Sequence, residues 1–194
     1  YHIAVDRNGA ATTIYIDGVN RASGTVTVVD AAAATALKFG TDQNNGRNLT
    51  GYMDEIRISD TARYTANFTP PTTAFTSDSN TKLLIHSDTT VGSTTFDDSG
   101  ATDHTITANG DVMHVAPKIG TGMAAFDGVD DYVTIPMQDQ SFLESDSSFS
   151  ISFYLKNSSD TQASIFTNIS DPVWWGYFEF RRLNGKLHLI LSDV

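Results

Sequence analysis

The amino-acid sequence predicts an all-β sandwich or jelly roll, and three observations support this fold class. Short stretches of alternating apolar and polar residues recur along the chain, which is the pattern of strands buried on one face. Turn signals of the Asn-Gly type lie between several of them, at Asn8-Gly9, Asn109-Gly110 and Asn184-Gly185. Helical periodicity is almost absent, and the best helix candidate, residues 30–34, is too short to be stable alone.

Composition and charge narrow the possible functions. The 194 residues include 23 acidic and 12 basic side chains, which gives a formal net charge of −11. A domain this acidic repels phosphate backbones, so we expect no nucleic acid and no anionic membrane as a partner. Cysteine is absent, and no apolar run approaches the ~20 residues of a membrane helix. These features suit an exterior protein or a protein that binds cations.

The first part of the chain supplies five predicted strands, each bounded by a turn signal or a polar loop. They are residues 1–6, 12–17, 24–29, 35–39 and 51–58. In the first two strands, the alternation places Ile3 and Val5 on the same buried face as Ile14 and Ile16. This pair of strands, with Asn8-Gly9 between them, predicts a hairpin.

The second part of the chain supplies ten further predicted strands. They are residues 82–86, 94–96, 104–108, 112–115, 123–126, 132–135, 148–155, 163–168, 176–181 and 186–191. The stretch 148–155 alternates most cleanly, with Phe149, Ile151, Phe153 and Leu155 directed inward. Many short strands at regular spacing, with turns between them, are typical of sandwiches and jelly rolls.

A connector separates the two parts. Residues 61–81 show the weakest periodicity, and Pro70-Pro71 removes two backbone donors, so this stretch is not a central strand. We expect the aromatic side chains of Tyr64, Phe68 and Phe75 to hold the connector against the surface of the sandwich.

The strand at 51–58 carries an unexpected carboxylate. Alternation places Asp54 on the same face as Ile56 and Ile58, and Glu55 on the opposite face. An unpaired carboxylate on such an apolar face would cost several kcal/mol, roughly, so Asp54 needs a partner. A bound divalent cation and backbone N–H donation at a sheet end are both consistent with the sequence.

The chain resembles a known family in two blocks. Residues 1–9, 14–18 and 51–58 together resemble the second half of a laminin-G-like, concanavalin A-like jelly-roll domain. Residues 83–88, 125–133 and 149–154 resemble the first half of the same kind of domain. The sequence of the connector, from Ala62 to Pro71, is similar to sequences found in tandem arrays of such domains in phage tail and other exterior proteins.

The two halves stand in the reverse of the family's order, as the end of one repeat followed by the start of the next. The resemblance implies that residues 1–60 and 82–194 close as one circularly permuted sandwich, joined by the connector 61–81. Tyr1 and Val194 would then lie near one another. The alternative is two incomplete half-sandwiches with exposed edges, which would aggregate or exchange strands.

The resemblance also implies a structural calcium site. The matching positions are the side chain of Asp54, Asp88 or its neighbouring backbone, and the carbonyl group of Gly128. Hard oxygen ligands of this kind suit Ca²⁺. The alternative is that these carboxylates only cap turns, which Asp does readily.

An enzymatic function is not expected. Related jelly-roll glycosidases carry Glu-x-Asp-x-x-Glu on one strand, and a retaining mechanism needs two carboxyl groups about 5–5.5 Å apart. Glu144 and Asp146 begin this pattern, but Phe149 stands at its last position. Asp54 and Glu55 are predicted on opposite faces, so they do not form such a pair either.

Trp174, Trp175 and Tyr177 are the best sugar-contact candidates, because indole faces stack on pyranose rings and the flanking Pro172 and Gly176 favour a displayed turn. Packing at a core or sheet edge is the alternative for at least one tryptophan. The sequence thus predicts a non-catalytic binding or adhesion module of a repetitive exterior protein, a phage tail fibre or secreted adhesin.

The expected partners are glycans or cell-surface polysaccharide and neighbouring repeats, at an extracellular or virion surface. A purely structural spacer is the alternative function, and a β-glucan hydrolase is the less favoured one.

Overall fold

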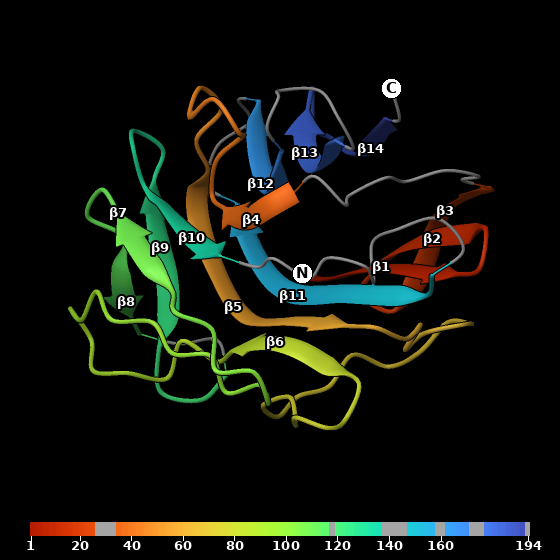
Figure 1. Cartoon of the computed structure of the whole chain (residues 1–194), viewed down its shortest axis with the longest axis horizontal. Coiled ribbons are helices and arrows are strands. Elements are labelled where there is room, and N and C mark those ends of the chain that lie inside the picture. The colour runs from red at the N-terminus through yellow and green to blue at the C-terminus, as the bar shows by residue number, and fades with distance from the viewer. Residues whose placement is uncertain (26–33, 117–118, 137–146, 158–161, 171–176, 193–194) are drawn as a thin grey trace.

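The computed structural model describes the chain except residues 26–33, 117–118, 137–146, 158–161, 171–176 and 193–194 (Figure 1). The described residues form fourteen strands in two antiparallel sheets and no helix, which confirms the predicted all-β sandwich. No described segment is therefore a helix long and apolar enough to cross a membrane.

The larger sheet has eight strands. Its order is β3-β2-β1-β11-β5-β9-β8, and β6 pairs with the other half of β5. Its strands are β1 (His2–Asn8), β2 (Ala11–Ile16), β3 (Val19–Thr25), β5 (Thr50–Ser59), β6 (Thr81–Ile85), β8 (Met113–Val115), β9 (Met123–Asp127) and β11 (Phe149–Asn157).

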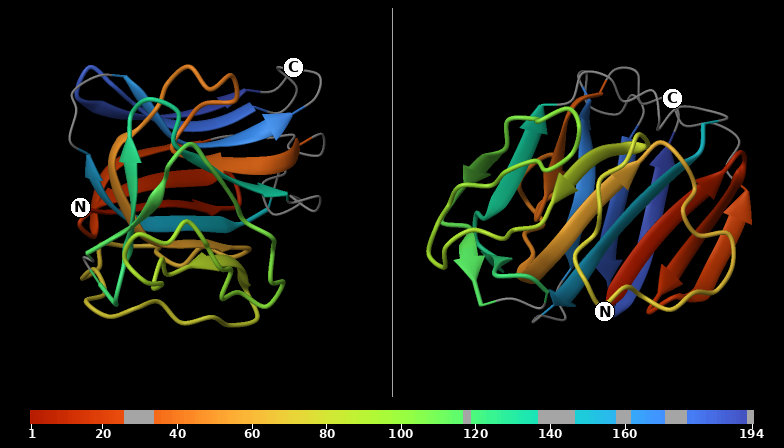
Figure 2. Two further views of the ribbon diagram at one scale, coloured as in Figure 1. Left: turned by 90° about the vertical axis from the view of Figure 1, so that its left-hand side faces the viewer. Right: turned by 90° about the horizontal axis from the view of Figure 1, so that it is seen from below.

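The smaller sheet has six strands in the order β14-β13-β12-β4-β10-β7. Its strands are β4 (Ala34–Phe39), β7 (Thr107–Asn109), β10 (Tyr132–Pro136), β12 (Ala163–Ser170), β13 (Tyr177–Leu183) and β14 (Lys186–Ser192). The two sheets stack face to face (Figure 2, left).

Residues before and after the connector share both sheets. β11 pairs with β1 on one side and with β5 on the other, and β4 lies between β10 and β12. One apolar core contains side chains from both parts, including Ile3, Phe39, Leu83, Phe153 and Phe180. The predicted proximity of Tyr1 to Val194 falls outside the described residues.

The connector covers the outer face of the eight-stranded sheet, the face turned away from the core (Figure 2, right). Tyr64 and Phe68 stack with ring centroids 3.6 Å apart, and Phe75 is 5% exposed. All three rings pack around the buried imidazole of His2. The predicted role of these aromatic side chains in holding the connector is confirmed.

Two expectations about local pairing are wrong. The segment 94–96 is not a strand. The turn at Asn109-Gly110 does not close a hairpin, because β7 pairs with β10 in the smaller sheet and β8 pairs with β9 in the larger one. By contrast, Asn8-Gly9 and Asn184-Gly185 do lie between paired strands, β1 with β2 and β13 with β14.

Candidate functional site

A β-bulge in β5 determines where the site lies. Between the pairs Arg57–Ser152 and Asp54–Tyr154, two residues of β5 oppose one residue of β11. Glu55, the first of the two, has a positive φ of 51°. At the same point the partner on the other side of β5 changes from β9 to β6.

The bulge corrects the predicted faces of β5. Met53, Ile56 and Ile58 belong to the apolar core, whereas Asp54 and Glu55 both make polar contacts outside it. Asp54 therefore does not share the face of the isoleucines. The extra residue shifts the alternation by one, so the two adjacent carboxylates lie on the same side of the sheet.

Asp54 is a buried carboxylate with one satisfied oxygen. It is 1% exposed, and its Oδ2 accepts a hydrogen bond from the Ile119 backbone N–H at 2.9 Å. Its Oδ1 is buried and has no hydrogen-bond partner among the described residues. Burial raises the pKa of Asp54 to about 7, and the negative charges of Glu55 and Asp88 add to the effect.

Asp88 approaches the same turn from the segment after β6. Its Oδ1 accepts hydrogen bonds from the N–H groups of Thr121, at 2.5 Å, and Gly122, at 3.2 Å. The Thr121 hydroxyl donates to the Asp88 carbonyl oxygen at 3.1 Å. Gly120 has a φ of +66°, and a Cβ there would clash with the Asp88 carboxylate, so this turn requires glycine.

These residues fit a hard cation. The turn 119–122 binds one oxygen of each carboxylate, which leaves Asp54 Oδ1 without a partner and Asp88 exposed. A cation here would remove the repulsion between Asp54 and Asp88 and satisfy the buried oxygen. The backbone donation considered as the alternative for Asp54 is also present, but it accounts for only one of the two oxygens.

Gly128 is not part of this arrangement. It lies beside Thr50, four residues before Asp54 on β5, which corresponds to about 13 Å along an extended strand. The structure therefore brings Asp54 and Asp88 to one turn and leaves the predicted carbonyl ligand at another.

An acidic cluster lies at the two turns that contain Gly110 and Gly128. Ligand atoms of Asp111, Asp127 and Asp131 lie within 4.8 Å of one another. Asp131 is 2% exposed, and its two oxygens accept the N–H groups of Asp111, at 2.8 Å, and Asp127, at 2.9 Å. Both oxygens of Asp131 thus have backbone partners, so this cluster caps its own turns, as Asp residues commonly do.

A groove opens beside Asp54. This groove, which we call the Tyr52 groove, has a volume of about 330 Å³. It is lined by Tyr1, Tyr52, Asp54, Met123, Tyr154, Leu155, Lys156 and Asn157. Lys156 Nζ lies 5.4 Å from the centroid of the Tyr52 ring, and Tyr1 is 74% exposed. Aromatic faces, an ammonium group and a buried carboxylate therefore meet in one hollow.

Glu55 has a structural role. It is 0% exposed; its Oε2 accepts the Phe75 N–H at 2.6 Å, and its Oε1 lies 2.8 Å from His86 Nδ1. The hydrogen bond that His86 donates to Glu55 raises the pKa of His86. Since both oxygens are engaged, Glu55 fixes the connector to β5 and is not available to a substrate.

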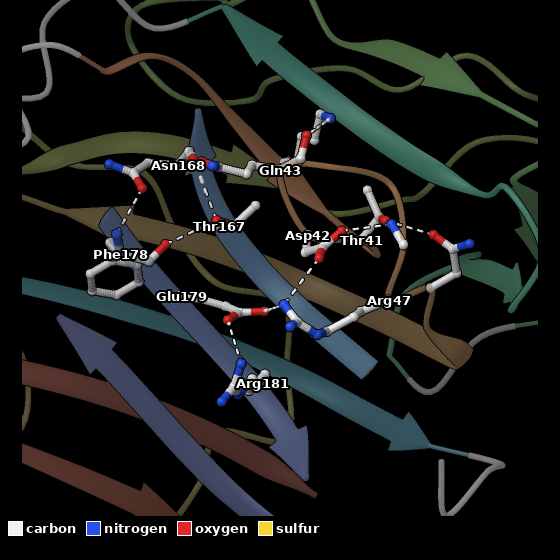
Figure 3. Close-up of polar contacts among 12 residues, drawn as sticks. Thr41, Asp42, Gln43, Arg47, Thr167, Asn168, Phe178, Glu179 and Arg181 are labelled. Atoms are coloured by element: carbon white, nitrogen blue, oxygen red, sulfur yellow. Dashed lines mark hydrogen bonds and ion pairs between the residues drawn. The ribbon is translucent and has the colours of Figure 1, made fainter. Parts of the chain in front are cut away.

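A second polar cluster lies on the smaller sheet (Figure 3). Arg47 Nη1 is 3.1 Å from Asp42 Oδ2 and 3.9 Å from Glu179 Oε1, and Arg181 donates to Glu179 Oε2 at 3.3 Å. Arg47 also accepts the Ser164 N–H through its carbonyl oxygen. Because Arg47 bridges the two carboxylates, the cluster fastens the loop 40–49 to β12 and β13.

Of the predicted sugar-contact residues, the structure describes only the backbone of Tyr177. Trp174 and Trp175 lie outside the described residues. Tyr177 begins β13, where it pairs with Ser192, but its side chain is also outside the described part.

Sequence reasoning missed the groove and the turn that binds the two carboxylates. Tyr52 and Tyr154 were available as aromatic residues, but Tyr154 is 102 positions from Tyr52, and only the pairing of β11 with β5 brings them together. The pattern Ile119-Gly-Thr-Gly122 was the available signal for a tight turn, because glycines at this spacing allow a close backbone approach.

One family model matches part of the chain. Residues 1–67 match the family model described as the concanavalin A-like lectin/glucanases superfamily, and this stretch contains β1 to β5 with the bulge. The comparison with curated proteins gave no match. The comparison with solved structures also gave no match.

Proposed function

We propose that this chain, whose residues 1–67 match the family model of the concanavalin A-like lectin/glucanases superfamily, is a non-catalytic module that binds glycans in the Tyr52 groove. The observation that carries the proposal is the lining of this groove. Tyr1 and Tyr52 offer aromatic faces for the apolar side of a pyranose, and Lys156 offers a donor for its hydroxyl groups. Its volume of about 330 Å³ lies at the lower end of the usual range for ligand sites, roughly 300–1,000 Å³.

The proposal includes a structural calcium ion held by Asp54 and Asp88. The support is the buried Asp54 oxygen without a partner and the second carboxylate at the same turn. When bound, the ion supplies positive charge that neutralises the two carboxylates. Asp54 lines the groove and Ile119 is hydrogen-bonded to it, so the ion would stiffen one wall of the ligand site.

Glycan binding is favoured over glycan cleavage. A hydrolase needs two carboxyl groups that reach the same bond, one as acid and one as base or nucleophile. Asp54 faces the groove, but both oxygens of its neighbour Glu55 are engaged with Phe75 and His86. We expect no release of reducing sugar from β-glucans.

The proposed setting is a repetitive exterior protein, a phage tail fibre or a secreted adhesin, at an extracellular or virion surface. The net charge of −11 supports a partner that is not a polyanion such as nucleic acid. Neighbouring repeats would be further partners. A structural spacer, the alternative function, needs no ligand and would leave the groove without a role.

A glycan array tests the function. We expect the wild-type chain to bind at least one glycan and Tyr52→Ala to weaken this binding at least ten-fold, because the stacking face is lost. Tyr132→Ala is the matched control, since Tyr132 is a partly buried tyrosine of β10 in the other sheet. Absence of binding across the array would support the spacer instead. Trp174→Ala and Trp175→Ala remain expected to weaken binding if these side chains extend the site.

A further inference from the structure

The strands before and after the connector interleave. We call β1 to β5 the first part and β6 to β14 the second part. Six of the pairings between described strands join the two parts, and they are β1–β11, β5–β11, β5–β6, β5–β9, β4–β10 and β4–β12. β11 of the second part thus lies between β1 and β5, and β4 of the first part lies between β10 and β12. In each sheet, a strand of one part fills a gap in the other.

Neither part pairs all of its own strands. Among the described strands, β4 and β5 have all their partners in the second part, and β6 and β11 have all of theirs in the first. These four strands also carry core side chains that are at most 1% exposed, namely Phe39, Ile56, Leu83 and Phe153. A part on its own would leave strand edges and apolar side chains in water. Each part therefore presents a surface that is complementary to the other.

The connector begins and ends at one place. Ser59 of β5 is opposite Thr81 of β6, and next to this pair the Asp60 N–H donates to the Asn80 carbonyl oxygen at 3.0 Å. The connector is the covalent link between the parts, whereas the pairings and the core that hold them together are noncovalent. A second copy of the chain presents the same edges and the same core side chains, so it can supply either part.

The connector is hydrogen-bonded to the first part as far as Phe75. Asp6 Oδ1 accepts the Arg63 N–H at 2.8 Å. Glu55 Oε2 accepts the Phe75 N–H at 2.6 Å. Residues 76–80, which follow, are exposed. This short exposed segment is where a chain would cross from its own first part to the first part of another copy.

We propose that this chain recognises a second copy of itself, and that two copies exchange their second parts to build two complete sandwiches. In the exchanged pair, each Tyr52 groove contains Tyr52 and Asp54 from one copy and Tyr154 and Lys156 from the other. The groove is then a site that neither copy completes without its partner. This proposal goes beyond the proposed function, which requires only the closed single chain.

Concentration decides between the closed and the exchanged form. A short linker keeps the two parts of one copy at an effective concentration on the order of millimolar. Separate copies at micromolar concentration therefore close on themselves, and exchange competes at millimolar concentration or between copies that are tethered side by side. Exchange requires all the pairings between the parts to open, so it takes place when the chain folds.

The test mixes two full-length variants that cannot fold alone. One carries Leu37→Asp and Ile58→Asp in the first part, and the other carries Phe153→Asp and Phe166→Asp in the second. All four positions are 0% exposed and belong to the core. Two unpaired buried charges outweigh the stability of an ordinary domain, so we expect each variant alone to be unfolded. Refolded together from urea, they can form one sandwich from the intact first part of one copy and the intact second part of the other.

We expect the mixture to recover about half of the near-UV circular dichroism of the wild-type chain, since two chains yield one sandwich, with the mass of two chains by light scattering. The matched control mixes the first-part variant with Ile3→Asp/Val5→Asp. Both members of this control lack an intact first part, so it should recover no signal. A complementary mixture that behaves as the sum of its two members, or a control that recovers equally, overturns the proposal.

The wild-type chain gives an independent measurement. Refolded at micromolar concentration it should be a monomer, and refolded at millimolar concentration it should also contain dimers that persist after dilution, because the exchanged parts separate only on unfolding. A monomer alone under both conditions overturns the exchange between copies. Neither result bears on glycan binding by the closed chain.

Discussion

Replacing Asp54 by Asn should stabilise the calcium-free protein at pH 8 by on the order of 3 kcal/mol. Burial raises the pKa of Asp54 from its ordinary value of 3.8 to about 7. Its contribution to stability is therefore fully present below pH 3.8 and is lost as the pH rises through about 7. At pH 8 the wild-type protein carries a buried charge without a partner for Oδ1, and the amide removes that charge.

The measurement is the free energy of unfolding in urea, in the presence of a chelator, at pH 4 and at pH 8. The gain from Asp54→Asn should be much smaller at pH 4, where the wild-type carboxyl group is already protonated in the folded state. Asp103→Asn, at an exposed position, is the matched control and should change stability little.

Calcium should reverse the order of the two proteins. A ligand that binds only the folded state stabilises it, so millimolar calcium should raise the stability of the wild-type protein but not that of Asp54→Asn. If calcium stabilises both equally, Asp54 does not hold the ion. If the two proteins have equal stability at pH 8 without calcium, the assignment of a destabilising buried charge to Asp54 is wrong as well.

Replacing Glu55 by Ala should destabilise the protein by about 3 kcal/mol, because it leaves one buried and one half-buried group without their acceptor. These groups are the N–H of Phe75 and the imidazole of His86. Glu55→Gln should cost less, since its amide oxygen can still accept the Phe75 N–H. Both variants keep a side chain at the same positive φ, so the backbone strain largely cancels in the comparison.

The pH dependence gives a second readout of the Glu55–His86 pair. Because Glu55 raises the pKa of His86, the pair contributes stability that is fully present below pH 6.5 and is lost as the pH rises through the raised value. Unfolding in urea at several values from pH 6 to pH 9 should show a larger loss in the wild-type protein than in Glu55→Ala, which keeps only the loss due to Asp54. An equal cost for the Ala and Gln variants, or a loss below 1 kcal/mol in Glu55→Ala, would contradict the role assigned to Glu55.

Local patterns in the sequence were sufficient for the fold class and for several elements. Alternation at residues 148–155 identified β11, and Asn184-Gly185 identified the β13–β14 hairpin. Both depend on neighbouring residues, whose spacing and turn chemistry are visible in one chain segment. The anchoring of the connector by Tyr64, Phe68 and Phe75 followed from their aromatic surface alone.

The rest depends on pairings between distant segments. Asn109-Gly110 has the same turn chemistry as a hairpin, but its flanking strands enter different sheets, and only the shared core decides this. The bulge at Glu55 is a single extra residue, which reverses the predicted face of Asp54 without changing the composition of β5. Ile119 and Tyr154 reach Asp54 only because β5 pairs with β9 and β11.

A calorimetric scan of the whole chain tests the central claim, that residues on both sides of the connector share one core and together build the site at Asp54. The account predicts one unfolding transition, with equal calorimetric and van't Hoff enthalpies, because β1, β4 and β5 each pair with strands from the second part. Two separate transitions would contradict it, since the two parts would then unfold independently and could not hold a common site.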